Sequence, residues 1–360
     1  MSPDRPVDLD ALDLARLDPS GMCARVAGLG ADAVRAHQAA AALDWAARPR
    51  PRAVAVCGMG GSAIAADLLR GYLADELEFP VEVVRDYRLP AWVGPECLVV
   101  ASSYSGNTEE TVAAYAEARR RGAPRAAVCS GGRLAELARE DGAPRAALPP
   151  GYPPRAALAW SFFTLLGAFV KWGFAGSRER EVAAAVRQLE RAAEKLGPAV
   201  PEAANPAKRL ARALHRRLPV VYAAACPLEP VALRWRQQLN ENAKTLAHQL
   251  SLPEQNHNEV EGWAHPPELL RGCAVVLLRD RSEHPRVRAR FDLAVPHAAA
   301  AGAAVHAVES RGETLLERLL GLVVTGDWVS VYLAFLNHVD PTPVARLEAL
   351  KKRLEESGAA

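Results

Sequence analysis

Short apolar runs alternate with amphipathic stretches along most of the chain, in two successive segments. The runs are too short for buried helices and are bounded by glycine, proline and small polar residues, so each predicts a buried strand. Predicted strands lie at 53–57, 81–84, 97–101, 126–129, 220–224, 274–278 and 304–308. Predicted helices run to about residue 72, from about 109 to 120 and from 229 to 250. This alternation is typical of an α/β protein whose parallel sheets are covered on both faces.

Helical and helix-breaking regions separate the two alternating segments. Residues 8–50 have helical periodicity with no strand, and a long helical region covers about 156–196. A proline-rich stretch at 197–206 ends it, and helices dominate again from Gly312 onward. We therefore predict an N-terminal helical segment at 1–50, a first α/β domain at 51–196 and a second at 197–360.

Charge and cysteine usage limit the possible partners. The 360 residues carry 44 basic and 42 acidic side chains, whereas a nucleic-acid-binding surface needs a concentrated basic excess. Six cysteines form no CxxC pair and mostly lie in predicted strands, so we expect buried free thiols rather than a metal site. The N-terminus lacks an apolar signal core, and we expect no stretch to be long and apolar enough to cross a bilayer. The sequence therefore predicts a cytoplasmic protein with no nucleic-acid or membrane partner.

Two loops that follow predicted strands are rich in glycine and hydroxyl groups. Residues 58–63 are Gly-Met-Gly-Gly-Ser-Ala, and residues 102–108 are Ser-Ser-Tyr-Ser-Gly-Asn-Thr. In a doubly wound sheet, ligands bind at the carboxyl ends of strands, where helix N-termini present free N–H groups. The candidates for a phosphate cradle are Gly61, Ser62, Ser103, Ser105 and Thr108, because glycine admits close backbone approach and hydroxyls donate to phosphate.

Each loop also has a simpler explanation. A tight turn accounts for the glycines, and an N-cap cluster accounts for a Ser or Thr before the helix expected from Glu109. The first loop overlaps the dinucleotide fingerprint, with Ala63 at a position where the fingerprint tolerates alanine. It is not a P-loop, since no Gly-Lys-Ser/Thr follows. Together the two loops favour phosphate binding.

The second segment carries groups suited to proton transfer. Residues 240–244 are Asn-Glu-Asn-Ala-Lys, and residues 253–260 are Pro-Glu-Gln-Asn-His-Asn-Glu-Val. Glu241 and His257 are therefore candidates for a general base and a general acid. In isolation, Glu241 would be interpreted as a solvated carboxylate paired with Lys244, and His257 as a structural loop residue. Their dense polar surroundings favour chemistry instead.

Taken together, these motifs resemble the bifunctional phosphoglucose/phosphomannose isomerases of the sugar isomerase (SIS) domain superfamily. The resemblance covers about residues 50–355 and includes, besides the loops and motifs above, Arg234-Trp235 and the stretches 326–334 and 340–344. It implies two SIS-type doubly wound subdomains, each a parallel sheet flanked by helices, after a helical lead-in. It also implies that glucose 6-phosphate, and mannose 6-phosphate, are interconverted with fructose 6-phosphate through a cis-enediol.

Roles for individual residues follow from the resemblance. The positions that hold the substrate phosphate are matched by Ser62, Ser103, Ser105 and Thr108. Glu241 matches the proton-transfer base, and Arg133 matches the arginine beside the enediolate. His257 matches the ring-opening histidine, which reaches the site from the partner subunit of a homodimer.

The C-terminal region carries two further matches. Lys351, with Lys352 adjacent, resembles a C-terminal active-site lysine, and Thr342 resembles a hydroxyl residue associated with acceptance of both epimers. Aldose–ketose isomerisation moves one proton between neighbouring carbons, so the resemblance implies no metal and no redox cofactor.

One turn departs from the family pattern, and two other functions stay open. Residues 225–227 are Ala-Cys-Pro where a glycine-serine turn is expected, so specificity could differ if this turn contacts substrate. An amino-sugar phosphate isomerase or deaminase would use the same phosphate cradle. A non-enzymatic sugar-phosphate sensor would need a DNA-binding or partner domain, and the N-terminal segment has no basic helix-turn-helix pattern.

Overall fold

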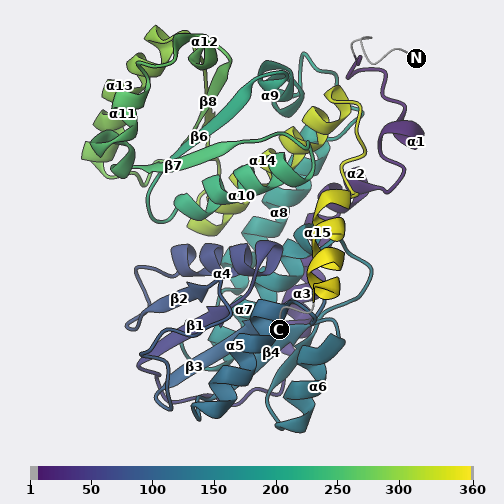
Figure 1. Ribbon diagram of the computed structural model, residues 1–360, viewed down its shortest axis with the longest axis vertical. Coiled ribbons are helices and arrows are strands. Elements are labelled where there is room, and N and C mark those ends of the chain that lie inside the picture. The colour runs from purple at the N-terminus through teal and green to yellow at the C-terminus, as the bar shows by residue number, and fades with distance from the viewer. Residues whose placement is uncertain (1–6, 358–360) are drawn as a thin grey trace.

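The protein contains two parallel sheets, one in each half of the chain. The structure, a computed structural model, describes residues 7–357 (Figure 1). The first sheet has the strand order β2-β1-β3-β4-β5 and the second has the order β7-β6-β8-β9, and every pairing is parallel. The predicted fold class, two parallel doubly wound sheets flanked by helices, is confirmed.

The strands of the first sheet are β1 (Ala53–Cys57), β2 (Val81–Val84), β3 (Cys97–Ser102), β4 (Arg125–Cys129) and β5 (Arg145–Ala147). The central strands β1 and β3 are buried along their whole length, because helices cover both faces. Of these five strands, only β5 was not predicted from the sequence. It has three residues, of which just Ala146 is buried, so it carries almost no apolar pattern. The helices α4 (Gly60–Tyr72), α5 (Glu109–Arg120) and α6 (Gly132–Glu140) follow β1, β3 and β4.

The second sheet consists of β6 (Leu218–Ala224), β7 (His248–Leu252), β8 (Cys273–Arg279) and β9 (Ala304–Glu309). The helix predicted over 229–250 is wrong in its second part. The observed helix α10 (Glu229–Glu241) ends earlier, and strand β7 follows it. The backbone reverses at Lys244, whose φ is +55°, and the chain then pairs with β6 from His248 onward. Leucines 246 and 250 continue a helical spacing, but this non-local pairing overrides it.

Helices form the layer that joins the two halves. They are α1 (Leu14–Leu17), α2 (Met22–Ala27), α3 (Leu29–Ala41), α7 (Leu158–Lys171), α8 (Glu179–Leu196), α9 (Pro206–Leu214) and α14 (Leu315–Leu336). Helix α3 packs along α7, and α14 packs against α8, α9 and α10. The long helical region predicted at 156–196 is therefore two helices, broken near Gly173, whose φ is +80°. Helix α4 packs on α10 between the two sheets (Figure 1).

Helix α14 corrects a second expectation. Among residues 7–357 it is the one helix long and apolar enough to span a membrane, whereas the sequence suggested that none would be. Here 94% of its most apolar window is buried inside the protein. Its apolar residues cover the whole circumference, which is typical of a central core helix.

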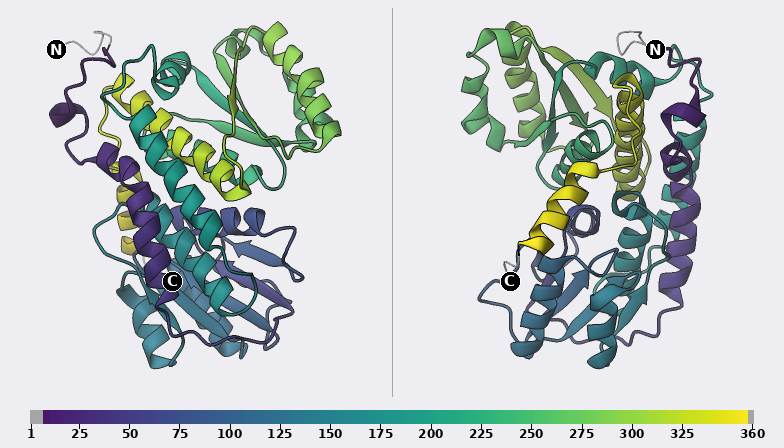
Figure 2. Two further views of the ribbon diagram at one scale, coloured as in Figure 1. Left: turned by 180° about the vertical axis from the view of Figure 1, so that it is seen from behind. Right: turned by 45° about the vertical axis from the view of Figure 1, so that its right-hand side comes forward.

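Smaller helices complete the chain. They are η1 (Pro154–Ala157), η2 (Glu254–His257), α11 (Glu259–Gly262), α12 (Pro267–Leu270), α13 (Pro285–Ala300) and α15 (Ala345–Glu356). Helix α15 leaves the second half and ends beside the first half (Figures 1 and 2). Leu347, Leu350 and Leu354 on it are exposed. The predicted helical segment at 1–50 is represented by α1 to α3, and its first six residues lie outside the described part.

Candidate active site

The loops after β1, β3 and β4 meet at the carboxyl edge of the first sheet. The backbone N–H of Tyr104 donates to Ser62 Oγ (3.1 Å), which ties the β3 loop to the start of α4. The N–H of Ser130, after β4, donates to the Tyr104 carbonyl (2.9 Å). Gly106 lies so close to the Gly131 carbonyl that a Cβ would meet its oxygen at 1.7 Å. The three loops therefore form one closely packed rim.

Hydroxyl groups of the predicted phosphate cradle line this rim. Ser103 Oγ and Thr108 Oγ1 are 2.8 Å apart, and Ser103 Oγ also accepts the N–H of Gly106 (3.1 Å). Ser105 Oγ accepts the N–H of Asn107 (3.2 Å). Thr108 is the N-cap residue of α5, but no side-chain hydrogen bond caps that helix. The capping explanation is therefore wrong for these hydroxyls, and the free N–H groups at the start of α5 point toward the rim.

Arg155 connects this rim to the second half of the protein. It follows Pro154 in η1, which packs so closely on Gly61 that a Cβ there would meet the Pro154 carbonyl oxygen at 2.7 Å. The Arg155 side chain is only 3% exposed. Its Nη1 lies 3.6 Å from Glu241 Oε2, and its Nε donates to Asn242 Oδ1 (2.6 Å). The structure thus brings the predicted base next to a buried cation and the start of α4.

A buried network of polar side chains fixes the positions of Arg155 and Asn242. Arg234 donates to both carboxylate oxygens of Asp327 (3.1 and 2.9 Å) and to the Arg155 carbonyl (3.0 Å). Asn242 donates to Ser330 Oγ (2.9 Å), so its amide orientation is fixed from the side opposite Arg155. The Arg234-Trp235 and 326–334 stretches of the family resemblance therefore belong to this network. These hydrogen bonds restrict Arg155 and Asn242 to one arrangement.

Arg155 was not among the residues predicted from the sequence. Its only local signal is an arginine after two prolines at the start of an apolar helix, a pattern that does not specify chemistry. The predicted arginine, Arg133, is exposed instead, and its Nη1 pairs with Glu136 (3.0 Å) and Glu140 (3.2 Å) on α6. No contact in the described chain joins the Arg133 guanidinium to Glu241. Its backbone N–H does donate to Asn107 Oδ1 (2.8 Å), so the residue belongs to the rim through its main chain.

Lys244 does not pair with the Glu241 carboxylate, contrary to the simpler explanation. Its Nζ donates to the Glu241 backbone carbonyl and to the Pro341 carbonyl (3.0 Å). Burial, and then the neighbouring Arg155 charge, lower the pKa of Lys244 to about 8. Arg155, and not Lys244, is therefore the cation that pairs with the Glu241 carboxylate.

His257 and Lys351 lie on exposed surfaces. His257 is the last residue of η2, and Lys351 lies on α15. Two residues after His257, Glu259 accepts from His248 Nε2 (2.8 Å) and from the Tyr222 hydroxyl. Within residues 7–357 neither His257 nor Lys351 contacts Glu241, so in one subunit they stand apart from the pair of Glu241 and Arg155.

The turn that departs from the family pattern lies at the far end of α4. Cys226 Sγ faces the Gly71 carbonyl (3.9 Å), and a Cβ on Gly71 would meet the Pro227 carbonyl oxygen at 3.2 Å. Gly71 and Gly61 are separated by almost the whole length of α4. The Ala-Cys-Pro turn therefore packs the two halves together and does not reach the cradle.

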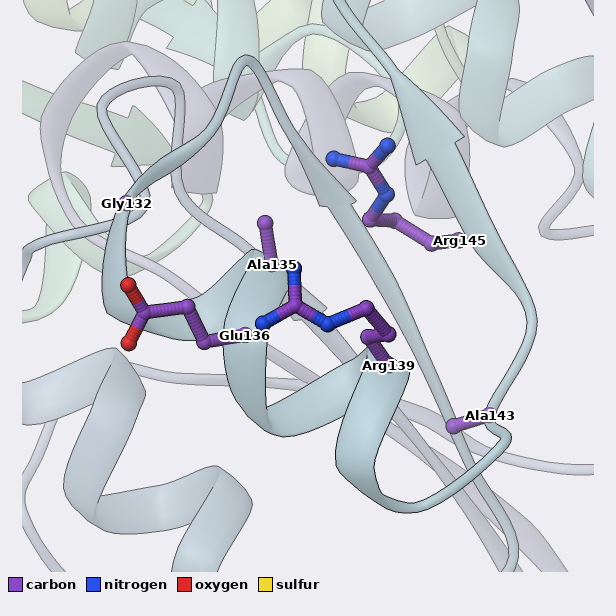
Figure 3. Close-up of a pocket in the computed structure, with 6 residues that line it drawn as sticks. All are labelled: Gly132, Ala135, Glu136, Arg139, Ala143 and Arg145. Atoms are coloured by element: carbon purple, nitrogen blue, oxygen red, sulfur yellow. The ribbon is translucent and has the colours of Figure 1, made fainter.

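A cavity of about 460 Å³ lies between α6 and the segment that leads into β5 (Figure 3). Its lining residues are Gly132, Ala135, Glu136, Arg139, Ala143 and Arg145. None of the predicted site residues lines it, and we do not assign it to the candidate site.

Both halves of the chain match known protein families. The SIS domain family matches residues 50–142, and the family described as the bacterial phospho-glucose isomerase C-terminal SIS domain matches residues 203–354. Both halves thus belong to the sugar isomerase class. A glucose-6-phosphate isomerase-like protein from Thermus thermophilus has the same fold, with a TM-score of 0.64 and 22% identity over 96% of this chain and 99% of its own.

Sequence relatives define the family more closely. A bifunctional phosphoglucose/phosphomannose isomerase from Caldicellulosiruptor bescii is 41% identical over 84% of this chain and 89% of its own length. The chain belongs to the bifunctional phosphoglucose/phosphomannose isomerase family. A D-glucosamine-6-phosphate 4-epimerase from Sulfolobus acidocaldarius is 36% identical, but over 58% of this chain and 63% of its own length.

Proposed function

We propose that this protein interconverts glucose 6-phosphate and mannose 6-phosphate with fructose 6-phosphate. The observation that carries the proposal is the Arg155–Glu241 pair, 3.6 Å apart, beside a cradle of hydroxyls and helix N-termini. One carboxylate can move a proton between C1 and C2 on one face of the substrate. A fixed cation stabilises the oxyanion that develops during that transfer.

Glu241 is the proton-transfer base in this proposal. It lies at the last turn of α10, where its carboxylate is partly accessible and paired with Arg155. Arg155, rather than Arg133, is the cation beside the enediolate, because it is the arginine that contacts the base. Its guanidinium keeps its charge throughout, so it supports the intermediate without exchanging the migrating proton.

The substrate phosphate occupies the rim formed by Gly61, Ser62, Ser103, Ser105 and Thr108. A hydroxyl that accepts a backbone N–H, as Ser62 and Ser103 do, still has its own hydrogen to donate to phosphate. The phosphate is remote from the reacting carbons, and its binding free energy positions them.

His257 opens the sugar ring from the partner subunit of a homodimer, and Lys351 approaches the substrate from α15. The exposure of both residues in one subunit supports these assignments, because each is free to face a second chain or a ligand. We also propose a cytoplasmic location and the domain division 1–50, 51–196 and 197–360.

An amino-sugar phosphate reaction is the second candidate, favoured by the partial match to the glucosamine-6-phosphate epimerase. A coupled assay with glucose 6-phosphate, mannose 6-phosphate and glucosamine 6-phosphate distinguishes the two. We expect fructose 6-phosphate from the first two substrates. Turnover of glucosamine 6-phosphate alone, or no turnover of any of the three, contradicts the proposal.

A further inference from the structure

The loop before α15 is fastened to the residues around Glu241. Arg155 Nη2 donates to the backbone carbonyls of Pro341 and Thr342, both at 2.7 Å. Lys244 Nζ donates to the same Pro341 carbonyl (3.0 Å) and to the Glu241 carbonyl. Two cations from opposite halves of the chain therefore converge on one loop, which we call the strap (residues 340–343).

Both cations link the strap to the end of α10, but Lys244 does so through the Glu241 backbone carbonyl, whereas Arg155 contacts the side chains of Glu241 and Asn242. The Glu241 carbonyl lies at the C-terminal end of α10, where helix carbonyls lack intrahelical partners and attract cations. Its ammonium thus joins the last turn of α10 to the strap. Thr342 Oγ1, in that strap, is buried and has no partner within residues 7–357.

Lys244 also holds an unfavourable backbone conformation. Its φ of +55° lies in the left-handed region, which disfavours residues with a Cβ. Asn337 Nδ2 donates to the Ala243 carbonyl and to Thr245 Oγ1 (both 2.9 Å), so the turn is held on both sides of Lys244. A glycine would suit this backbone better, and the two hydrogen bonds of the Lys244 ammonium offset part of that cost.

We propose that Lys244 is a positioning residue that sets the distance between the Glu241 base and the strap through its ammonium group. The strap leads directly into α15, so the same contact sets where α15 begins relative to the site. The inference rests on the proposed isomerase function, because it concerns the same site. Lys244 acts through backbone carbonyls and need not touch the substrate.

The charge on Lys244 is sensitive to pH in the working range. The groups that face it are Arg155, which disfavours its charge, and Glu241 and Asp340, which favour it. With burial as the largest cause, its pKa falls to about 8, so the ammonium is present below pH 8 and lost above it. As pH rises through this range, the contact with the two carbonyls weakens.

Lys244→Gly removes the cation and leaves a backbone that glycine readily adopts. We expect the variant to fold with an unchanged or higher melting temperature, and kcat to fall by about 10-fold, the size of one hydrogen bond to a charged group. We expect KM to change less, because the phosphate contacts lie on other loops. Lys244→Asn, which also tolerates this backbone, serves as a second variant.

The pH profile separates positioning from a merely structural role. Wild-type kcat should decline above about pH 8 as Lys244 loses its proton. Lys244→Arg keeps a cation at all working pH values, so this decline should move to higher pH with most of kcat retained. Lys244→Gly should show no decline near pH 8. A kcat and pH profile equal to wild type in Lys244→Gly would overturn the inference.

Hydrogen exchange provides a test that does not depend on activity. Amide exchange of a peptide covering the strap should be faster in Lys244→Gly than in wild type, and near wild type in Lys244→Arg. Unchanged exchange in Lys244→Gly would also refute the link. An inactive wild-type protein would instead refute the proposed function, while this comparison would still test the contact.

Discussion

The Arg155 guanidinium lies 3.6 Å from the Glu241 carboxylate, although the two residues come from different halves of the chain. Arg155 is nearly fully buried, and four of its contacts lead outside its own half, to Glu241, Asn242, Pro341 and Thr342. A buried cation held in this way is preorganised, so it needs little rearrangement when negative charge develops on the substrate. In the proposed function, the proton transfer therefore takes place beside the Arg155–Glu241 pair.

The first prediction concerns the base. Glu241→Gln keeps the shape of the side chain and a hydrogen-bonding oxygen but removes the proton acceptor. We expect kcat to fall by at least about 10²-fold, the usual size of a general acid–base contribution. Binding of fructose 6-phosphate, measured by calorimetry, should persist. Near-wild-type turnover of a correctly folded Glu241→Gln protein would remove Glu241 from the mechanism.

A second comparison decides between the two arginines. Arg155→Lys keeps the charge but loses the planar set of donors, and we expect kcat to fall by about 10²-fold. Its melting temperature should also fall, because Asn242 Oδ1 and the Thr342 carbonyl lose the guanidinium donors and the Pro341 carbonyl keeps only Lys244. Arg133→Lys is the matched control, since its ion pairs lie on the exposed surface of α6. If Arg133→Lys loses more activity than Arg155→Lys, the assignment must be reversed.

The third prediction tests the phosphate cradle. The double substitution Ser103→Ala and Thr108→Ala should raise the Kd for fructose 6-phosphate at least about 10²-fold, because each lost charge-assisted hydrogen bond is worth roughly 1.5–3 kcal/mol. Stability should fall by only about 1 kcal/mol, for the lost Gly106-to-Ser103 bond.

Thr111→Val is the control for this cradle experiment. Thr111 lies further along α5, and its buried hydroxyl has no hydrogen-bond partner in the described structure. We expect wild-type affinity from Thr111→Val. An unchanged Kd in the double variant would show that phosphate binds elsewhere.

The fourth prediction uses the close packing at Gly61. In the Gly61→Ala variant, the alanine Cβ would lie 2.7 Å from the Pro154 carbonyl oxygen and 3.0 Å from Arg155 Cα, so η1 must shift. We expect this shift to move Arg155 away from Glu241 and to lower kcat more than stability. Gly94→Ala, where a Cβ would meet nothing within 4 Å, is the control. Crystal structures of both variants would show directly whether Arg155 has moved.

The fifth prediction concerns subunit assembly. If His257 acts in the partner's site, a Glu241→Gln subunit and a His257→Ala subunit form a heterodimer in which one of two sites is intact. Mixing the two inactive proteins under subunit exchange should then restore activity well above either parent. Absence of recovery, with heterodimers confirmed by native mass spectrometry, would place His257 in its own subunit's site or outside the chemistry.

Much of the fold follows from local sequence patterns. The strands at 53–57 and 81–84 and the helix at 109–120 were predicted with the bounds that the structure has, because their apolar spacing and their glycine-rich or polar boundaries act locally. The motifs around Ser103 and Glu241 likewise identified the loops of the candidate site. The roles of individual residues within those loops remain predictions.

The tertiary structure alone decided where α10 ends, which arginine meets the base and what Lys244 contacts. Leu246 and Leu250 continue a helical pattern, yet the chain after Glu241 forms β7 because its backbone pairs with β6. Arg155 reaches Glu241 because η1 packs on Gly61 and the two halves join along α4, α10 and α14. Local patterns report which residues face a core, whereas contacts between distant segments depend on how whole elements pack. The sequence by itself therefore determined the elements and the loops, and only the packing of the two halves determined the site that lies between them.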